Sequence, residues 1–201
     1  ACAAPLDEPR ITSRFGWRDH PHPKYKGKTK FHTGVDFGGD TGDVVRSIHN
    51  GEVLATNETD RGGEGSGYGL YVLVRHPELT WQGKEVLSFY GHLSEVSVEE
   101  GDEVSRGEKV GELGDTGTST ASHLHFETQV DADDADEDLV YNTPDKYRKP
   151  DMPHPEGKLH GPRGFTYRES DMGYAKQYFF NPLELDYDPP IGSPRKFKPS
   201  A

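Results

Sequence analysis

Four histidines and one aspartate are the side chains in this sequence that are best suited to chemistry. They are His32, Asp36, His92, His123 and His125. They fall in three short segments, FHTGVDFG at 31–38, FYGHLS at 89–94 and SHLHF at 122–126. Imidazole and carboxylate groups are the ligands expected for zinc, and a catalytic zinc site takes three protein ligands and leaves one position for water. The sequence therefore offers more groups than zinc requires, and the surplus can act on the water or on a substrate.

The spacing of these residues indicates strands and bends rather than a helix. His32 and Asp36 are four apart, as on one face of a helix, but Gly34 and the glycines that follow disfavour a helix there. A glycine lets the chain bend, so both side chains can still reach one ion. In a strand, residues two apart share a face, so we expect His123 and His125 to point together and their neighbours to turn into the core.

Each of these signals is weak when it stands alone. A histidine that ends a predicted strand, as His92 does, is usually a surface or hydrogen-bonded residue, and an isolated H-x-H occurs by chance. Their co-occurrence carries the weight. Glu127 follows His125 on the same strand face and could hydrogen bond to a ligand histidine. The other histidines fit no ligand spacing; they are His20, His22, His49, His76, His154 and His160.

Short strands joined by turns must position these side chains. The 24 glycines and 15 prolines are scattered among short apolar runs, and no stretch has sustained helical periodicity. We predict a mainly β fold, a small antiparallel sheet. The expected elements are strands at 44–48, 51–56, 68–75, 85–92 and 109–113, a short helical turn at 93–96 and a hairpin at Asn50-Gly51.

Charge, hydropathy and cysteine content exclude several classes of protein. The balance of 23 Lys and Arg against 35 Asp and Glu leaves a net charge of −12. An acidic surface repels phosphate backbones, so we expect no nucleic-acid partner. Mean hydropathy is −0.88 and the apolar runs are short, so we expect no transmembrane segment. A single cysteine, Cys2, excludes an internal disulfide and a Cys-based zinc or iron–sulfur cluster.

Composition divides the chain into five parts. We expect a flexible lead at 1–9, without an intact signal peptide, although a chain that has lost its leader would also fit. A catalytic domain at 10–130 follows. The acidic run DADDADED at 131–138 opens an apolar-poor insertion or flap that extends to 177. Residues 178–186 return to the core, and 187–201 form a Pro-rich tail.

The segment from Ile11 to Gln129 resembles the lysostaphin/LytM-type zinc endopeptidases, the M23 metallopeptidase family. The segments that carry the resemblance are ITSRFGWR at 11–18, HTGVD at 32–36, NGEV at 50–53, GYGLYV at 67–72, YGHLS at 90–94, GDEV at 101–104, GDTGTS at 114–119, HLHFE at 123–127 and NPL at 181–183. The combination is specific although each piece alone is not. Typical members close soon after the H-x-H strand, so the long segment at 131–177 is a departure from the family pattern.

The resemblance implies a small, mostly antiparallel β-fold, related to barrel-sandwich folds, with an open substrate groove. It implies hydrolysis of peptide bonds in bacterial peptidoglycan by one bound Zn²⁺. By motif position, His32, Asp36 and His125 would bind the metal. His92 and His123 would be catalytic, with the base and the proton donor left unassigned between them.

The substrate and location follow from the same resemblance. Peptidoglycan peptides are short and carry few side chains, and a narrow groove rimmed by Tyr68 and Tyr90 would suit them. The bond cleaved stays open between a D-alanyl–diaminopimelate cross-link, a glycine bridge and a stem-peptide bond. We expect a monomeric, exported protein that is periplasmic, outer-membrane-associated or secreted. Cys2 could carry a lipid anchor, or it could be an ordinary thiol.

Two other functions fit parts of the sequence. A non-catalytic M23-like module would bind or activate another cell-wall hydrolase, but such relatives usually lack metal ligands, and here all five positions are filled. A biotinyl or lipoyl carrier would explain the hairpin pattern at 101–111. A carrier needs a lysine at an exposed hairpin tip, whereas Lys109 stands in a strand pattern.

Overall fold

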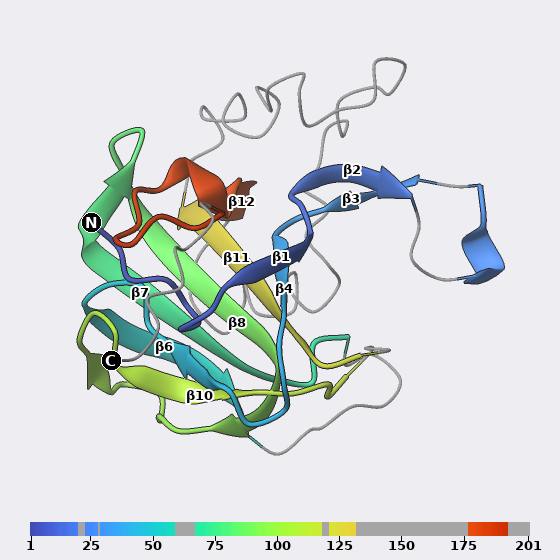
Figure 1. The fold of residues 1–201 in the computed structure, drawn as a ribbon. Coiled ribbons are helices and arrows are strands. Elements are labelled where there is room, and N and C mark those ends of the chain that lie inside the picture. Colours follow the sequence, from blue (N-terminus) through green and yellow to red (C-terminus); the bar gives the residue numbers. More distant parts are fainter. Residues whose placement is uncertain (20–22, 28, 59–66, 118–120, 132–176, 193–201) are drawn as a thin grey trace, which may run out of the picture.

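A computed structural model describes residues 1–19, 23–27, 29–58, 67–117, 121–131 and 177–192. Over these ranges the chain is mostly antiparallel strand with short 3₁₀ turns, and the predicted mainly β fold is confirmed (Figure 1). The open groove expected across the sheet stays a prediction. None of the helical segments in these ranges has the length and apolar character needed to cross a membrane.

The strands in chain order are β1 (Arg10–Ser13), β2 (Gly16–Asp19), β3 (Thr29–His32), β4 (Val35–Gly38), β5 (Val44–Arg46), β6 (Gly51–Asn57), β7 (Leu70–Trp81), β8 (Lys84–Val96), β9 (Glu103–Val104), β10 (Lys109–Leu113), β11 (His123–Asp131) and β12 (Gln177–Phe180). The short helical segments are η1 (Pro23–Tyr25) and η4 (Pro182–Glu184).

One large sheet places the predicted chemical segments on neighbouring strands. Its order is β1-β4-β11-β8-β7-β6-β9, with β12 beside β11 and with β10 paired to both β5 and β8. The ribbon of β2 and β3 forms a separate two-stranded sheet that extends from the main one (Figure 1). In the central register, His125 of β11 lies opposite Asp36 of β4 on one side and Gly91 of β8 on the other.

The apolar face of β11 forms part of the core. Leu124 and Phe126 have 0% of their surface exposed, and the Phe126 ring packs 5.5 Å from the ring of Tyr90 and 6.2 Å from that of Phe37, centroid to centroid. Because side chains alternate along a strand, His123 and His125 occupy the opposite face. The predicted burial of Leu124 and Phe126 in the core is confirmed.

The helical turn predicted at 93–96 is wrong, because these residues continue strand β8. Leu93 pairs with Leu113 and Val96 with Gly111 of β10. Leu93 is completely buried. Strand β10 forms with β8 the backbone hydrogen bonds that a helical turn would form internally. Strand β8 therefore extends past His92.

The hairpin predicted at Asn50-Gly51 is also wrong. Strand β5 pairs with β10, whereas β6 pairs with β7 and β9. A Cβ atom on Gly51 would overlap the backbone carbonyl oxygen of Arg75, and the Asn50 side-chain oxygen accepts a hydrogen bond of 2.8 Å from the Arg106 backbone N–H. The glycine therefore permits a close approach between strands β6 and β7 rather than a turn.

The segment expected to be a flexible lead instead lies against the core. Cys2 and Leu6 are buried, and the Cys2 N–H donates to the Asp186 carbonyl at 2.7 Å. Tyr187, at the start of the expected tail, is only 5% exposed. Cys2 is 1% exposed, and burial raises the pKa of its thiol to about 11. The lipid anchor considered at Cys2 stays a prediction.

The boundaries of the predicted insertion coincide with two paired strand ends. Asp131 ends β11 and pairs with Gln177, which begins β12. Residues 132–176 lie outside the part of the chain that the structure describes. Phe179 and Phe180 of β12 are buried, so the residues after the insertion contribute to the core.

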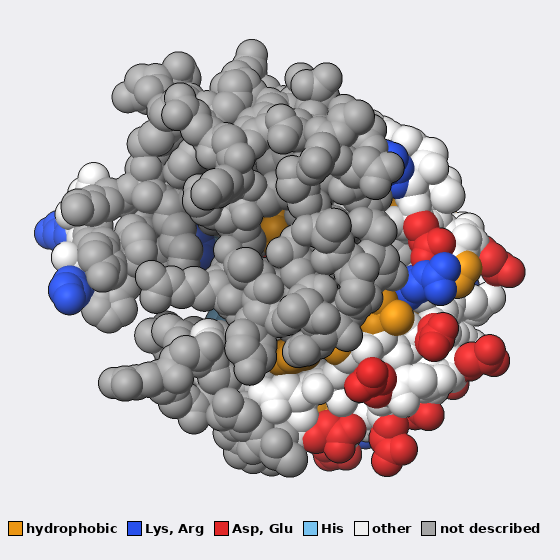
Figure 2. Space-filling model, turned by 180° about the vertical axis from the view of Figure 1, so that it is seen from behind, with side chains coloured by type: hydrophobic (Ala, Val, Ile, Leu, Met, Phe, Trp, Pro, Cys, Tyr) orange, Lys and Arg blue, Asp and Glu red, His pale blue; other side chains and the backbone are white. Residues whose placement is uncertain are grey.

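Acidic side chains are exposed on the face of the molecule that Figure 2 shows. Figure 2 shows Asp and Glu side chains over the part of this face that is not drawn in grey. This distribution agrees with the net charge of −12.

Candidate metal centre

Three of the predicted site residues bring their ligand atoms together. His32 Nε2 lies 3.1 Å from Asp36 Oδ1 and 3.2 Å from His125 Nδ1, and His125 Nδ1 lies 2.9 Å from Asp36 Oδ1. All three residues are buried. The atoms form a nearly equilateral triangle at the junction of β3, β4 and β11.

Hydrogen bonds on the far side of each ring determine which nitrogen faces this triangle. His32 Nδ1 lies 2.9 Å from the carbonyl oxygen of Arg14, and His125 Nε2 lies 2.8 Å from Glu127 Oε1. Both partners are acceptors, so these nitrogens carry the protons and donate. In the neutral rings, the lone pairs of the other two nitrogens point at each other and at the Asp36 carboxylate. Such a convergence of electron pairs needs a cation.

The protonation of the cluster reflects this need for positive charge. Burial lowers the pKa of His125, but hydrogen bonds to the carboxylates of Asp36 and Glu127 outweigh it and raise the pKa to about 9. Burial lowers the pKa of His32. Burial raises the pKa of Asp36, yet its hydrogen bonds to the two histidines dominate and hold it below the ordinary value. A proton on His125 Nδ1 can therefore supply the charge where no metal does.

The three donors fit zinc in both chemistry and spacing. Two imidazoles and one carboxylate are typical zinc ligands, and zinc bonds of about 2.0–2.1 Å in a tetrahedron place the ligand atoms roughly 3.3 Å apart. The observed separations of 2.9 to 3.2 Å are close to that value. Three protein ligands leave the fourth position of a tetrahedron free for water.

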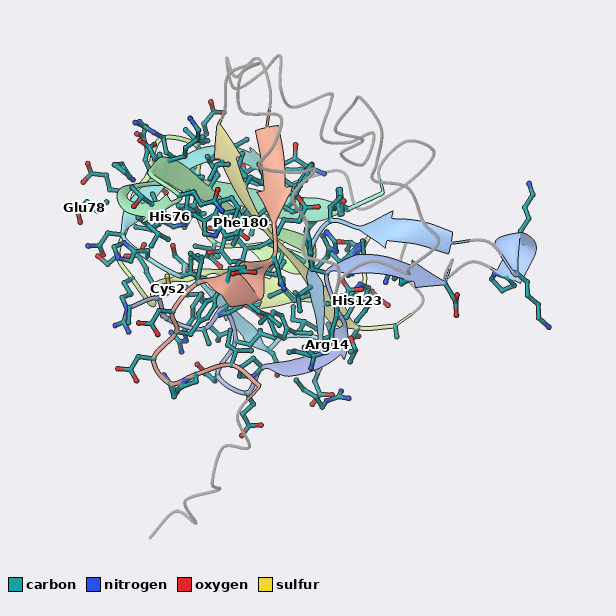
Figure 3. The ribbon with its side chains drawn as sticks, turned by 90° about the horizontal axis from the view of Figure 1, so that it is seen from above. Cys2, Arg14, His76, Glu78, His123 and Phe180 are labelled. Carbon is teal, nitrogen blue, oxygen red and sulfur yellow. The ribbon has the colours of Figure 1, made fainter. Side chains whose placement is uncertain are left out.

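The other two predicted residues lie beside the triangle. His123 Nε2 is 4.0 Å from Asp36 Oδ1, and the ring centroids of His92 and His123 are 4.7 Å apart. Figure 3 shows His123 near Arg14, at the base of the β2–β3 ribbon, with His76 toward the other end of the molecule. The structure thus brings all five predicted residues into one cluster.

Backbone carbonyls orient both of these rings. His92 Nδ1 lies 2.8 Å from the Thr116 carbonyl oxygen, and His123 Nδ1 lies 2.8 Å from that of Ala121. Each Nδ1 therefore donates its proton, so in the neutral rings Nε2 carries the lone pair that can accept a proton. Burial, reinforced by the charges of His125 and His123, lowers the pKa of His92 to about 3, so this ring is neutral near pH 7.

Close backbone approach explains how the segment at 32–36 brings two donors to one point. A Cβ atom on Gly34 would overlap the carbonyl oxygen of Phe126 and would lie 3.0 Å from Glu127 Cγ. Only a glycine lets the bend between β3 and β4 pack this tightly against β11. His32 and Asp36, on either side of the bend, then both face His125.

Residues that the sequence did not identify complete the surroundings. Arg18 Nη1 donates to Asp36 Oδ2 at 3.4 Å and to Ser13 Oγ at 2.8 Å. The two oxygens of Asp36 are thereby divided between the histidines and the guanidinium. Thr33 Oγ1 donates to Glu127 Oε1 at 3.0 Å. The only sequence signal for Arg18 and Thr33 is their place inside segments that carry the family resemblance.

Of the two tyrosines expected to rim a groove, one lies in the core and the other lies beside the histidine cluster. Tyr90 is completely buried, and its hydroxyl accepts from the Ile48 backbone N–H at 3.0 Å. The Tyr68 hydroxyl donates to Glu127 Oε1 at 3.0 Å, and its ring stacks on that of His125. Tyr90 is therefore a core residue, and Tyr68 belongs to the surroundings of the histidine cluster.

A small antiparallel β-fold with a two-histidine, one-aspartate centre flanked by two further histidines defines the class of this protein. The chain belongs to peptidase family M23, whose family model matches residues 30–137. It is 40% identical over 126 residues to the DD-carboxypeptidase/endopeptidase Mpg of Neisseria meningitidis serogroup B, a match that covers 63% of this chain and 26% of the relative. It is 38% identical over 101 residues to the glycyl-glycine endopeptidase ALE-1 of Staphylococcus capitis, covering 50% and 25%.

These matches span about a quarter of the length of each curated relative. Among solved structures, a zinc-containing peptidase from Vibrio cholerae is 31% identical with a TM-score of 0.49, covering 62% of this chain and 35% of that chain. The catalytic domain of lysostaphin from Staphylococcus simulans is 26% identical with a TM-score of 0.49, covering 64% and 85%.

Proposed function

We propose that this chain is a zinc-dependent endopeptidase that hydrolyses peptide bonds in bacterial peptidoglycan. The observation that carries the proposal is the convergence of His32 Nε2, Asp36 Oδ1 and His125 Nδ1 within 3.2 Å of one another. Family membership and relatives named as endopeptidases support it. Because peptidoglycan lies outside the cytoplasmic membrane, the proposal includes export of the protein.

His32, Asp36 and His125 would hold the zinc ion. A bound zinc ion lowers the pKa of its water and polarises a carbonyl group. The side chains beside the ligands must then meet the charge that develops during amide hydrolysis. His92 and His123 would do this, because each keeps Nδ1 on a backbone carbonyl. His123 Nε2 lies 4.0 Å from Asp36 Oδ1, and the ring centroids of His92 and His125 are 6.1 Å apart. A neutral Nε2 can accept a proton, and a protonated one can stabilise the oxyanion or protonate the leaving amine.

The two alternative functions receive less support. A module that only binds another hydrolase has no need of the two further histidines beside the ligand triangle. The carrier hypothesis requires a lysine at a hairpin tip, whereas Lys109 begins strand β10 and donates to Glu112 Oε2 at 2.9 Å. The endopeptidase proposal accounts for all five residues of the cluster.

The test is digestion of purified peptidoglycan and defined muropeptides by the zinc-loaded chain. The substrates include a D-alanyl–diaminopimelate cross-link, a glycine bridge and an uncross-linked stem peptide, and mass spectrometry identifies the cleaved bond. We expect cleavage that a chelator abolishes and that added zinc restores. Asp36→Ala is the matched control and should lose both zinc and activity. A folded, zinc-loaded chain that cleaves none of these substrates would favour the non-catalytic module.

A further inference from the structure

We propose that Glu127 is a positioning residue of the metal centre, and that Tyr68 and Thr33 hold it in place. Glu127 is 0% exposed and lies on β11 two residues after His125. Its Oε1 atom lies 2.8 Å from His125 Nε2 and 3.0 Å from each of the hydroxyls of Thr33 and Tyr68. The inference rests on the proposed zinc site and concerns how that site is kept in shape.

Glu127 determines which ring nitrogen of His125 carries the proton, because the groups around this carboxylate must donate to it. Burying a carboxylate is costly unless hydrogen bonds compensate it. An ionised carboxylate only accepts, so each of its neighbours must donate. His125 therefore keeps its proton on Nε2 and presents Nδ1 to His32 and Asp36. Gln129 Nε2 donates to the second oxygen, Oε2, at 3.2 Å, so both oxygens of Glu127 are engaged.

The same group connects the two segments that carry the ligands. Thr33 lies between His32 and Asp36 in the bend before β4, and its hydroxyl reaches across to β11. The close approach at Gly34 makes this contact geometrically possible. Glu127 thus fixes the distance between the strand that carries His125 and the bend that carries the other two ligands.

Tyr68 restrains the ring of His125 in a second way. The two rings are 5.0 Å apart with an angle of 29° between their planes, which is a stacked arrangement. The hydroxyl of Tyr68 bonds to Glu127, so one side chain holds both the plane of the ligand ring and its hydrogen-bond partner. Partners of this kind orient a metal ligand and increase its basicity, and their removal typically costs 10- to 100-fold in metal affinity.

The test measures zinc affinity by competition with a chromophoric chelator in four proteins: the wild type, Glu127→Ala, Glu127→Gln and Tyr68→Phe. We expect Glu127→Ala to weaken zinc binding about 10- to 100-fold. Glu127→Gln should recover part of the loss, because its amide oxygen can still accept from His125. Tyr68→Phe keeps the stacked ring and removes only one donor, so its loss should be smaller than that of Glu127→Ala.

Long-range ¹H–¹⁵N NMR of His125 provides a readout that a merely structural role would not change. In the metal-free proteins above pH 9, where His125 carries a single proton, we expect the Nε2–H form in the wild type and a loss of that preference in Glu127→Ala. Unchanged zinc affinity together with an unchanged His125 spectrum in both Glu127 variants would overturn the proposal. Should Glu127→Ala not fold, Glu127→Gln and Tyr68→Phe still decide it. A wild type that binds no zinc would instead refute the proposed function, which separates the two failures.

Discussion

Every histidine in the cluster uses one ring nitrogen to bind an acceptor outside the cluster. Three acceptors are backbone carbonyls, those of Arg14, Thr116 and Ala121, and the fourth is the side chain of Glu127. A backbone carbonyl oxygen remains when the side chain of that residue is substituted, and it only accepts hydrogen bonds. It therefore fixes the tautomer of the histidine that donates to it. The protein therefore sets the role of each ring by the nitrogen that it anchors.

The backbone of His92 is itself in an uncommon conformation. Its φ angle is +61°, in the left-handed region, which costs a non-glycine residue roughly 1–3 kcal/mol. Its N–H donates to the Tyr68 carbonyl at 2.7 Å, and its ring to the Thr116 carbonyl at 2.8 Å. These two bonds hold the strained residue in place, so its ring is directed toward His123.

We predict that His92→Ala and His123→Ala each keep one zinc ion and lose activity. Neither ring belongs to the ligand triangle, and three protein ligands with water complete a tetrahedron. Loss of one group that stabilises developing charge costs about 10²–10³ in rate. Zinc content by atomic absorption and kcat on a muropeptide measure the two effects separately. If His123→Ala lost its metal while His125→Ala kept it, the assignment along β11 would be reversed, and full activity in both His92→Ala and His123→Ala would refute the histidine mechanism.

The sequence predicted which side chains meet but identified only one of the groups that orient them. The spacing of H-x-H on a strand placed His123 and His125 on one face, and the position of Glu127 suggested its contact with His125. The anchors at Thr116 and Ala121 are backbone carbonyls, and any residue type supplies a carbonyl. Their positions follow only from the paths of the loops in three dimensions.

At the scale of strands, a buried polar chain connects β7, β8 and the segment before β6. His76 lies 2.9 Å from the Asn50 carbonyl oxygen through Nδ1 and 2.7 Å from Ser88 Oγ through Nε2. The Ser88 hydroxyl hydrogen bonds with the hydroxyl of Tyr90 at 2.8 Å, and Tyr90 accepts from the Ile48 N–H. These hydrogen bonds compensate the burial of the polar groups and hold the neighbouring strands in one register.

We predict that His76 makes the fold less stable in acid. Burial lowers the pKa of His76 from 6.5 to about 4. Between those values the unfolded chain takes up a proton and the folded chain does not, so stability falls as pH decreases from about 6.5 to 4, by about 3 kcal/mol in total. Urea denaturation of the wild type and His76→Gln across this range measures the difference, and the metal contribution cancels between them. Parallel pH profiles of the two proteins would contradict the prediction.

Strand prediction succeeded where a strand has one buried face. It failed where contacts between residues distant in sequence determine the local structure. The segment at 93–96 is short and amphipathic, and only its pairing with β10 makes it a strand. Asn50-Gly51 has the composition of a turn. The glycine is needed for another reason, because a Cβ atom at this position would overlap the Arg75 carbonyl oxygen. Residues 1–9 contain little that predicts a strand, and their order comes from the partner segments around Ile48 and Asp186.

At the scale of the whole molecule, we predict that residues 131–177 are a flap that affects substrate choice and not folding. Asp131 and Gln177 are paired across β11 and β12, so a two-residue Asn-Gly turn can replace residues 132–176. We expect the shortened chain to fold, to hold zinc and to cleave an altered range of muropeptides. Circular dichroism, zinc content and muropeptide digestion check the three expectations, and loss of the fold would show that the segment is part of the core.

The hydrogen bonds between Cys2 and the segment around Tyr187 have a consequence for the order of events during synthesis. Cys2 N–H bonds to Asp186, and the Asp188 N–H bonds back to Cys2. The segment around Cys2 is synthesised before the segment around Tyr187, so its apolar side chains stay uncovered until that later segment has emerged from the ribosome. We expect nascent chains that end before Tyr187 to stay sensitive to protease and to depend on chaperones, because the core around Cys2 cannot close without the segment around Tyr187.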